Sequence, residues 1–116
     1  MKINVREREG VTILDIEGKI MGHDALELKR VIDEILASKG EGEVKLLLNL
    51  EKVPMMDSSG LGVIVAAYTS VQRKKGKIAL LHLGKSINNL IVLAKLTTIF
   101  DRYDDEDRAV AELSKD

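Results

Sequence analysis

A chain of 116 residues is long enough for one domain with a hydrophobic core and too short for two. Its 18 basic and 19 acidic residues leave a net charge of −1, so no basic surface for nucleic-acid binding is indicated. The absence of cysteine excludes a disulfide framework and thiolate metal sites, and no run approaches the roughly 20 apolar residues of a membrane span. Met1 to Glu9 carries alternating charges instead of the apolar run of a signal peptide, so we expect a cytoplasmic protein.

The first two elements form a predicted β-hairpin. Ile3 and Val5 alternate with charged residues, and a second apolar run follows over 11–16, with Glu9-Gly10 between the two. The charges of the first strand disfavour pairing with another chain, which indicates an edge strand.

A helix and a buried strand are expected next. The apolar spacing changes to about 3.6 residues, which predicts a helix over about 25–39. Asp24, with Glu27 three residues later, is its expected cap. Residues 44–50 then show no alternation, as in a strand that is buried on both faces.

Further helices and strands alternate along the rest of the chain. We expect a helix over 58–74, a strand over 77–83, a short helix capped by Ser86 and running to 96, a strand at 99–100, and a terminal helix beginning at the acidic residues 104–107. These acids lack the regular spacing of cation ligands, which favours a helix start over a cation site. The alternation implies parallel strands joined by right-handed crossovers. The predicted fold is therefore α/β, a single domain over 1–116 with a mixed sheet of four or five strands packed with helices.

The junction between the strand at 44–50 and the helix at 58–74 holds the most informative residues. Asp57 is a good N-cap, since its side chain can accept hydrogen bonds from the free amides of the first turn. Met56 and Leu61 fall at the two positions of a hydrophobic staple, which supports Asp57 as the cap. Ser58 is then the first helical residue, with an exposed hydroxyl at the positive end of the helix dipole.

Two glycines and two methionines flank these serines. Gly60 and Gly62 lie on the first turn, where alanine would be favoured by roughly 1 kcal/mol each, so we expect a close approach to the backbone. Met55 and Met56 form a flexible apolar pair that suits a partner interface, although Met56 as a staple residue is expected to be at least half buried. Leu61 and Gly62 are the other candidate docking residues.

The sequence argues against an enzyme. A catalytic serine needs a base, and the two histidines, His23 and His82, have structural explanations beside a helix cap and within a strand. No Gly-x-Ser-x-Gly elbow surrounds Ser58 or Ser59, no metal-ligand spacing joins the histidines, and no phosphate-binding loop exists. We therefore expect no catalytic residues, metal or cofactor.

The run Met-Asp-Ser-Ser-Gly-Leu-Gly-Val-Ile, after Leu-Leu-Leu-Asn-Leu at 46–50, resembles the phosphorylation-site segment of bacterial anti-sigma factor antagonists of the STAS family. The resemblance implies that Ser58, directly after the aspartate, is the phosphorylated residue; Ser59 is the rival acceptor. It also implies a partner switch. The unphosphorylated protein binds an anti-sigma factor that is also a serine kinase and so frees a sigma factor, phosphorylation ends binding, and a metal-dependent serine phosphatase restores it. The ATP and the metal then belong to the partners.

One position departs from the family pattern. Relatives typically have an acidic residue two or three positions after the glycine that corresponds to Gly18, and here Met21 stands in that place. This departure leaves open which partner is recognised and how the site handles a phosphate. An alternative also stays open, since STAS domains serve as non-switching subunits of transport complexes or signalling scaffolds.

Overall fold

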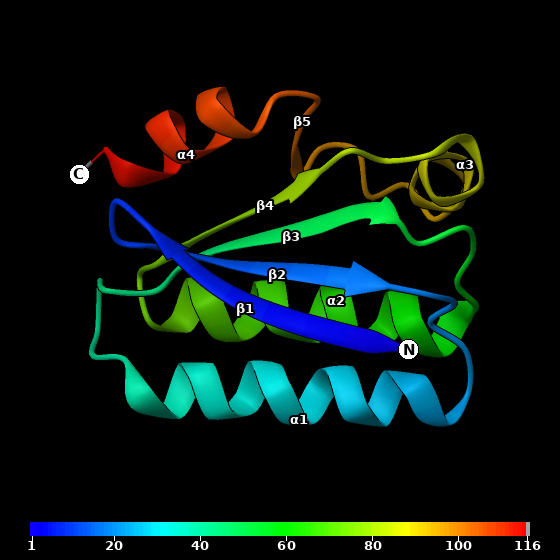
Figure 1. Ribbon diagram of the computed structural model, residues 1–116, viewed down its shortest axis with the longest axis horizontal. Helices are drawn as coiled ribbons and strands as arrows, with labels where there is room; N and C mark the ends of the chain where they lie inside the picture. Colours follow the sequence, from blue (N-terminus) through cyan, green and yellow to red (C-terminus); the bar gives the residue numbers. More distant parts are fainter. Residues whose placement is uncertain (116) are drawn as a thin grey trace.

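The computed structural model describes residues 1–115; Asp116, the last residue of the expected domain, lies outside them. Five strands form one sheet, and their order in space is their order in the sequence (Figure 1). β1 (Lys2–Arg8) is antiparallel to β2 (Val11–Glu17). β2, β3 (Lys45–Lys52), β4 (Lys77–Leu81) and β5 (Asp101–Tyr103) are parallel. This sheet confirms the predicted α/β class and its mixed strand directions.

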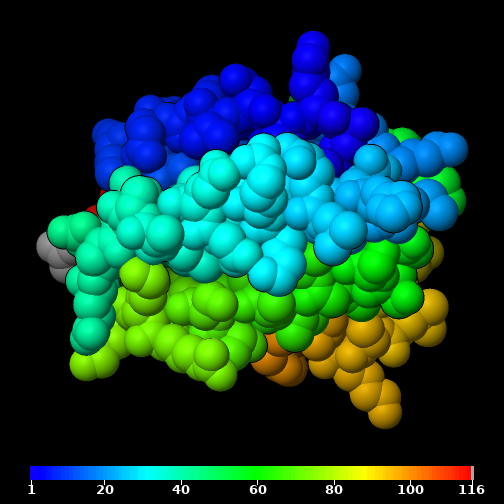
Figure 2. Space-filling model, turned by 90° about the horizontal axis from the view of Figure 1, so that it is seen from below, coloured from blue at the N-terminus to red at the C-terminus, as the bar shows by residue number. Residues whose placement is uncertain are grey.

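Helices cover both faces of the sheet. α1 (His23–Ser38) and α2 (Ser58–Arg73) lie side by side on one face, as Figures 1 and 2 show. α4 (Glu106–Ser114) covers part of the other face, and α3 (Lys85–Leu93) lies at the end of the sheet where β3 and β4 finish (Figure 1). The larger core therefore fills the space under α1 and α2, and a smaller apolar cluster lies under α4.

The hairpin between β1 and β2 confirms the sequence prediction. Glu9 and Gly10 have φ angles of 50° and 81°, the two left-handed residues that a two-residue type I′ turn requires. Arg8 then pairs with Val11, and the register continues to Lys2 opposite Glu17. β1 forms one edge of the sheet, as its charges indicate.

The predicted cap of the first helix is wrong. Gly22, with φ 55° and ψ −119°, is the N-cap of α1, and the helix begins at His23. Asp24 lies inside the first turn and accepts a hydrogen bond from the amide of Met21 at 3.4 Å. The helix starts early because glycine adopts a left-handed φ at little cost, which lets the chain turn sharply after β2.

Three elements in the second half also have boundaries that differ from the prediction. β4 ends at Leu81, before 83, because His82 takes a φ of 56°. α3 is capped by Gly84 instead of Ser86 and stops short of 96 because Lys95 takes a φ of 60°. The last strand is β5 and not residues 99–100, because Phe100 turns into the core with its ring edge-on to Tyr68, 5.5 Å between centroids.

Candidate functional site

The β3–α2 junction carries the serines at the start of α2. As predicted, α2 begins at Ser58 with Asp57 as its N-cap. One carboxylate oxygen of Asp57, Oδ1, accepts hydrogen bonds from the amides of Ser59 at 3.0 Å and Gly60 at 3.2 Å. The hydroxyl of Ser59 and these amides lower the pKa of Asp57 below its ordinary value. The roles of these residues in phosphorylation and docking stay predictions.

The two serines differ in their hydroxyl groups. The hydroxyl of Ser59 donates a short hydrogen bond to Asp57 Oδ1. The hydroxyl of Ser58 is exposed and makes no hydrogen bond with any residue between 1 and 115. Ser58 therefore presents the free hydroxyl of the pair.

The junction is joined to the loop between β2 and α1. Ile20 and Met56 form an isolated parallel bridge, in which the amide of Ile20 donates to Met55 at 3.2 Å and the amide of Asp57 donates to Ile20 at 3.3 Å. The amide of Gly22 donates to Asp57 Oδ2 at 3.1 Å. Two segments 35 residues apart, residues 20–22 and 55–57, are thus hydrogen-bonded to each other next to Ser58, and we call them the rim. No pattern in the sequence predicted this contact, which joins residues 35 positions apart.

The two glycines of α2 have different surroundings. A β-carbon on Gly60 would lie 2.8 Å from the carbonyl oxygen of Ile20 and 2.9 Å from its Cγ2. A β-carbon on Gly62 would meet nothing within 4 Å among the described residues. The expected close approach is therefore present at Gly60, where the β2–α1 loop packs on the helix. At Gly62, no described residue of this chain approaches the backbone.

Apolar side chains of the β3–α2 junction and of the β2–α1 region differ in their exposure. Met56 is only 8% exposed and packs in the larger core, with Leu61 half-buried against it, as the staple predicts. Met55 is 38% exposed, Met21 37%, and Leu26, in the first turns of α1, 64%. Of the two candidate docking methionines, Met55 is the one that a partner could reach without disturbing the core.

The STAS domain family model matches residues 2–109. This chain belongs to the STAS domain family. It is 28% identical over 113 residues to the anti-sigma F factor antagonist of Paenibacillus polymyxa, covering 97% of this chain and 95% of that one. It is 31% identical over 101 residues to the anti-sigma-B factor antagonist of Bacillus subtilis, covering 87% and 91%. A crystal structure of a Thermotoga maritima protein superimposes with a TM-score of 0.89 at 28% identity, covering 97% and 95%.

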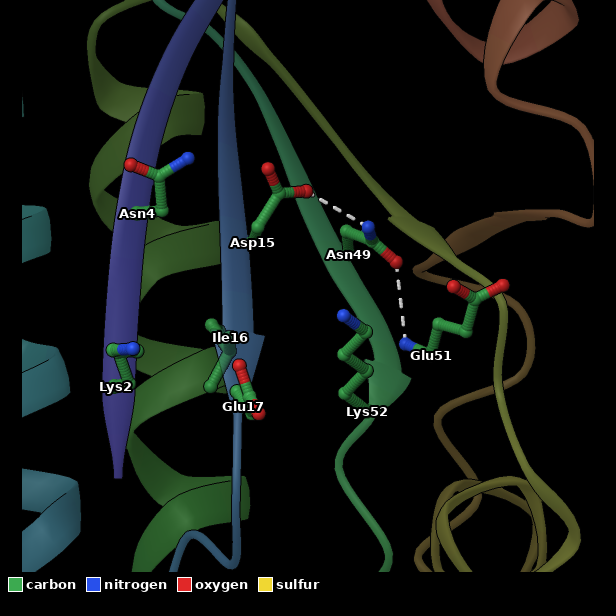
Figure 3. A pocket seen from close by; sticks show the side chains of 8 residues that line it. All are labelled: Lys2, Asn4, Asp15, Ile16, Glu17, Asn49, Glu51 and Lys52. Atoms are coloured by element: carbon green, nitrogen blue, oxygen red, sulfur yellow. Dashed lines mark hydrogen bonds between the residues drawn. The ribbon is translucent and has the colours of Figure 1, made fainter.

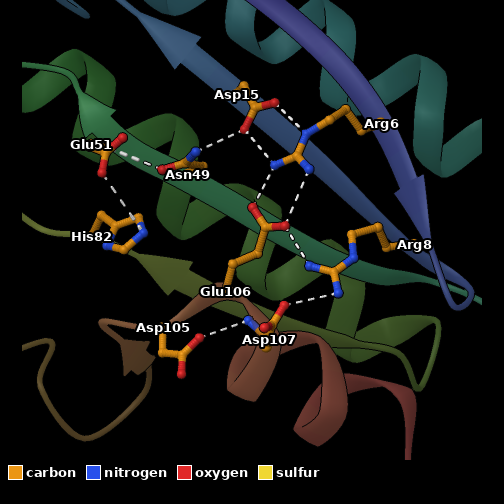
Figure 4. Close-up of polar contacts among 9 residues, drawn as sticks. All are labelled: Arg6, Arg8, Asp15, Asn49, Glu51, His82, Asp105, Glu106 and Asp107. Atoms are coloured by element: carbon orange, nitrogen blue, oxygen red, sulfur yellow. Dashed lines mark hydrogen bonds and ion pairs between the residues drawn. The ribbon is translucent and has the colours of Figure 1, made fainter.

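The face of the sheet that α4 covers carries a network of charged side chains that the sequence did not predict (Figure 4). Arg6 on β1 donates to Asp15 on β2 through Nε and Nη2 and to Glu106 at the start of α4 through Nη1 and Nη2. Arg8 also donates to Glu106, at 2.6 Å. The guanidinium of Arg6 holds the pKa values of Asp15 and Glu106 below their ordinary range. This network fastens the first turn of α4 onto β1.

A polar hollow of about 330 Å³ lies beside this network, lined by β1, β2 and β3 (Figure 3). On its floor, Asn49 donates to Asp15 at 2.8 Å and accepts from the amide of Glu51 at 3.2 Å. A register shift places Glu17 opposite Lys52, so Glu51 and Lys52 both border the hollow. No buried side-chain nitrogen or oxygen in the described chain lacks a hydrogen-bond partner. The floor of the hollow therefore needs no ligand to satisfy it.

Neither histidine of the STAS domain interacts with Ser58 or Ser59 among the described residues. His82 Nε2 is 3.9 Å from a carboxylate oxygen of Glu51, and no interaction joins it to either serine. His23 is the exposed first residue of α1. Over residues 1–115 no group of three potential ligands could hold a metal ion, and no helix is long and apolar enough to cross a membrane.

Proposed function

We propose that this STAS domain is a partner switch. In its unphosphorylated form it binds an anti-sigma factor that is also a serine kinase, which releases a sigma factor. Phosphorylation of Ser58 ends that binding, and a metal-dependent serine phosphatase restores the hydroxyl. The observation that supports the proposal most is the free, exposed hydroxyl of Ser58 at the first residue of α2.

Modification of Ser58 should leave the fold intact. A phosphate adds about −1.5 to −2 charges at pH 7. The N-terminal ends of α1 and α2 lie at the same end of the molecule (Figure 1), and a negative charge at a helix N-terminus gains roughly 0.3–1 kcal/mol. Because Ser58 is exposed at a helix N-terminus, we expect the switch to act mainly at the partner interface.

The rim of Ser58 supplies the apolar part of the interface. Met21 and Met55 are joined through the Ile20–Met56 bridge, so both methionines stay beside the serine. Flexible methionine side chains suit a partner surface. Burying the Ser58 hydroxyl among such residues would turn a phosphate into an uncompensated buried charge, with a loss of about 3–5 kcal/mol. Binding should then weaken by roughly two to four orders of magnitude.

The test is a binding and phosphorylation assay with the cognate anti-sigma factor kinase and ATP. Ser58→Ala should bind the kinase and resist phosphorylation, and Ser58→Asp should bind poorly, although one carboxylate imitates a dianion only in part. Ser86→Ala, at an exposed serine in the first turn of α3, is the matched control and should behave like the wild type. If neither Ser58 nor Ser59 is phosphorylated while a known substrate of the kinase is, the switch is wrong and the non-switching scaffold role replaces it.

A further inference from the structure

Two adjacent hydroxyl groups stand at the start of α2, and exposure does not distinguish them. Both Ser58 and Ser59 are exposed. Their difference lies in one neighbour, Asp57, whose Oδ1 accepts the hydroxyl and the amide of Ser59 and the amide of Gly60. From the other side, the amide of Gly22 donates to Oδ2. Four donors therefore fix this carboxylate in one orientation.

We propose that Asp57 determines which serine accepts the phosphoryl group, by holding the Ser59 hydroxyl and leaving Ser58 free. This inference rests on the proposed function, because it concerns the same phosphorylation. Asp57 acts here as a positioning residue, since it need not touch the transferred phosphate.

The chemistry of transfer gives the reason. The serine oxygen forms a bond to the γ-phosphorus of ATP, the bond from that phosphorus to the bridging oxygen breaks, ADP leaves, and the hydroxyl proton passes to a base of the kinase. The Ser58 proton can point toward that base at once. The Ser59 proton points to Asp57, so its hydrogen bond must break first.

Asp57 is a poor substitute for the kinase's own base. A carboxylate that accepts several hydrogen bonds is stabilised in its charged form, and the pKa of Asp57 is lowered accordingly. It therefore orients the Ser59 hydroxyl without removing its proton. Hydrogen bonds to charged groups are among the stronger ones, although solvent weakens this one. We therefore expect phosphorylation of Ser58 to be about tenfold faster than phosphorylation of Ser59.

The first measurement needs no kinase. Three-bond couplings between the α- and β-protons of Ser59 should report one χ1 rotamer in the wild-type protein, whereas those of Ser58 should report an average of rotamers. In Asp57→Gly, which keeps an acceptable N-cap residue but removes the carboxylate, Ser59 should average as well. Asp105→Gly removes the matching cap aspartate of α4, which accepts from the amide of Asp107, and should leave both serines unchanged. Rotamer averaging at Ser59 in the wild type overturns the inference.

The second measurement maps phosphate after incubation with the kinase and ATP. Ser58→Ala should take up phosphate about tenfold more slowly than the wild type. The same change combined with Asp57→Gly should be phosphorylated on Ser59 faster than Ser58→Ala alone. In the Ser58→Ala background, Asp57→Asn, which keeps the N-cap and removes only the charge, should give less phosphate on Ser59 than Asp57→Gly gives. Two results contradict the inference. One is phosphorylation of Ser59 in Ser58→Ala at the wild-type rate. The other is an unphosphorylated Ser59 in the protein with both Asp57→Gly and Ser58→Ala, when the protein with Asp57→Gly alone is phosphorylated. An unphosphorylated wild type instead counts against the proposed function, and the couplings still decide the role of Asp57.

Discussion

Alanine at Gly60 and at Gly62 should change stability in opposite directions, although only Leu61 separates the two glycines in the same helix. In a helix, alanine is favoured over glycine by roughly 1 kcal/mol, and neither residue has the left-handed φ that would penalise a side chain. The two positions differ only in their surroundings. Gly60 faces the carbonyl of Ile20 across 2.8 Å, measured from an added β-carbon, and Gly62 faces open space.

The magnitude follows from those distances. Relief of the clash at Gly60 requires movement of backbone, because Ile20 is held in place by its hydrogen bonds to Met55 and Asp57. Overpacking of this kind costs about 1–3 kcal/mol, which exceeds the gain in helix propensity. We expect Gly60→Ala to destabilise the fold by about 1 kcal/mol and Gly62→Ala to stabilise it by about 0.5–1 kcal/mol.

Urea denaturation followed by circular dichroism at 222 nm measures both changes, with wild-type protein in the same series. The unfolding midpoints should shift in opposite directions without a change in slope, and the melting temperatures of the two variants should differ by several degrees. A Gly60→Ala protein at least as stable as the wild type would refute the claim that the β2–α1 loop packs rigidly on α2. A destabilised Gly62→Ala protein would refute the claim that Gly62 has free space.

Three further predictions concern the charged network and the docking rim. Arg6→Met should lower the free energy of unfolding by about 1–2 kcal/mol, because it leaves Asp15 and Glu106 partly buried without their main partner. The control Lys2→Met, on the same strand, should have little effect, and thermal denaturation measures both changes. Because the pKa values of Asp15 and Glu106 are lowered in the folded protein, the unfolded chain binds more protons in acid. Stability should be complete above about pH 5 and fall as the pH drops below about 4, less steeply in Arg6→Met, and an acid titration with a parallel urea series tests this. Met55→Ala should weaken binding of the kinase with an unchanged melting temperature, and unchanged affinity would remove Met55 from the interface.

The sequence predicted features that depend on neighbouring residues. The cap at Asp57, the start of α2 and the staple of Met56 and Leu61 are local, since each is decided within one helical turn. The order and type of the elements followed from apolar periodicity for the same reason. Boundaries failed where a single backbone angle decided them, as at His82, whose left-handed φ no propensity rule anticipates.

Contacts between distant segments could not be predicted in this way. Arg6 meets Glu106 across 100 residues, and the amide of Gly22 meets Asp57 across 35. Such pairs depend on strand register and on where a helix crosses the sheet, which a single sequence does not specify. The orientation of the Asp57 carboxylate depends partly on such a contact, because the amide of Gly22 donates to its Oδ2.

The sequential strand order has a consequence for synthesis on the ribosome. Each new strand pairs with the strand made just before it, so the sheet can grow from β1 to β5 as the chain emerges, without waiting for a distant partner. One apolar surface of the sheet does depend on a later segment: the patch that α4 covers remains exposed until that helix has been synthesised. The patch on the strands comprises Val11, Ile13, Leu47, Ala79 and Leu81. A nascent chain paused before Glu106 would expose this apolar surface, and chaperones would have to protect it from association with other chains.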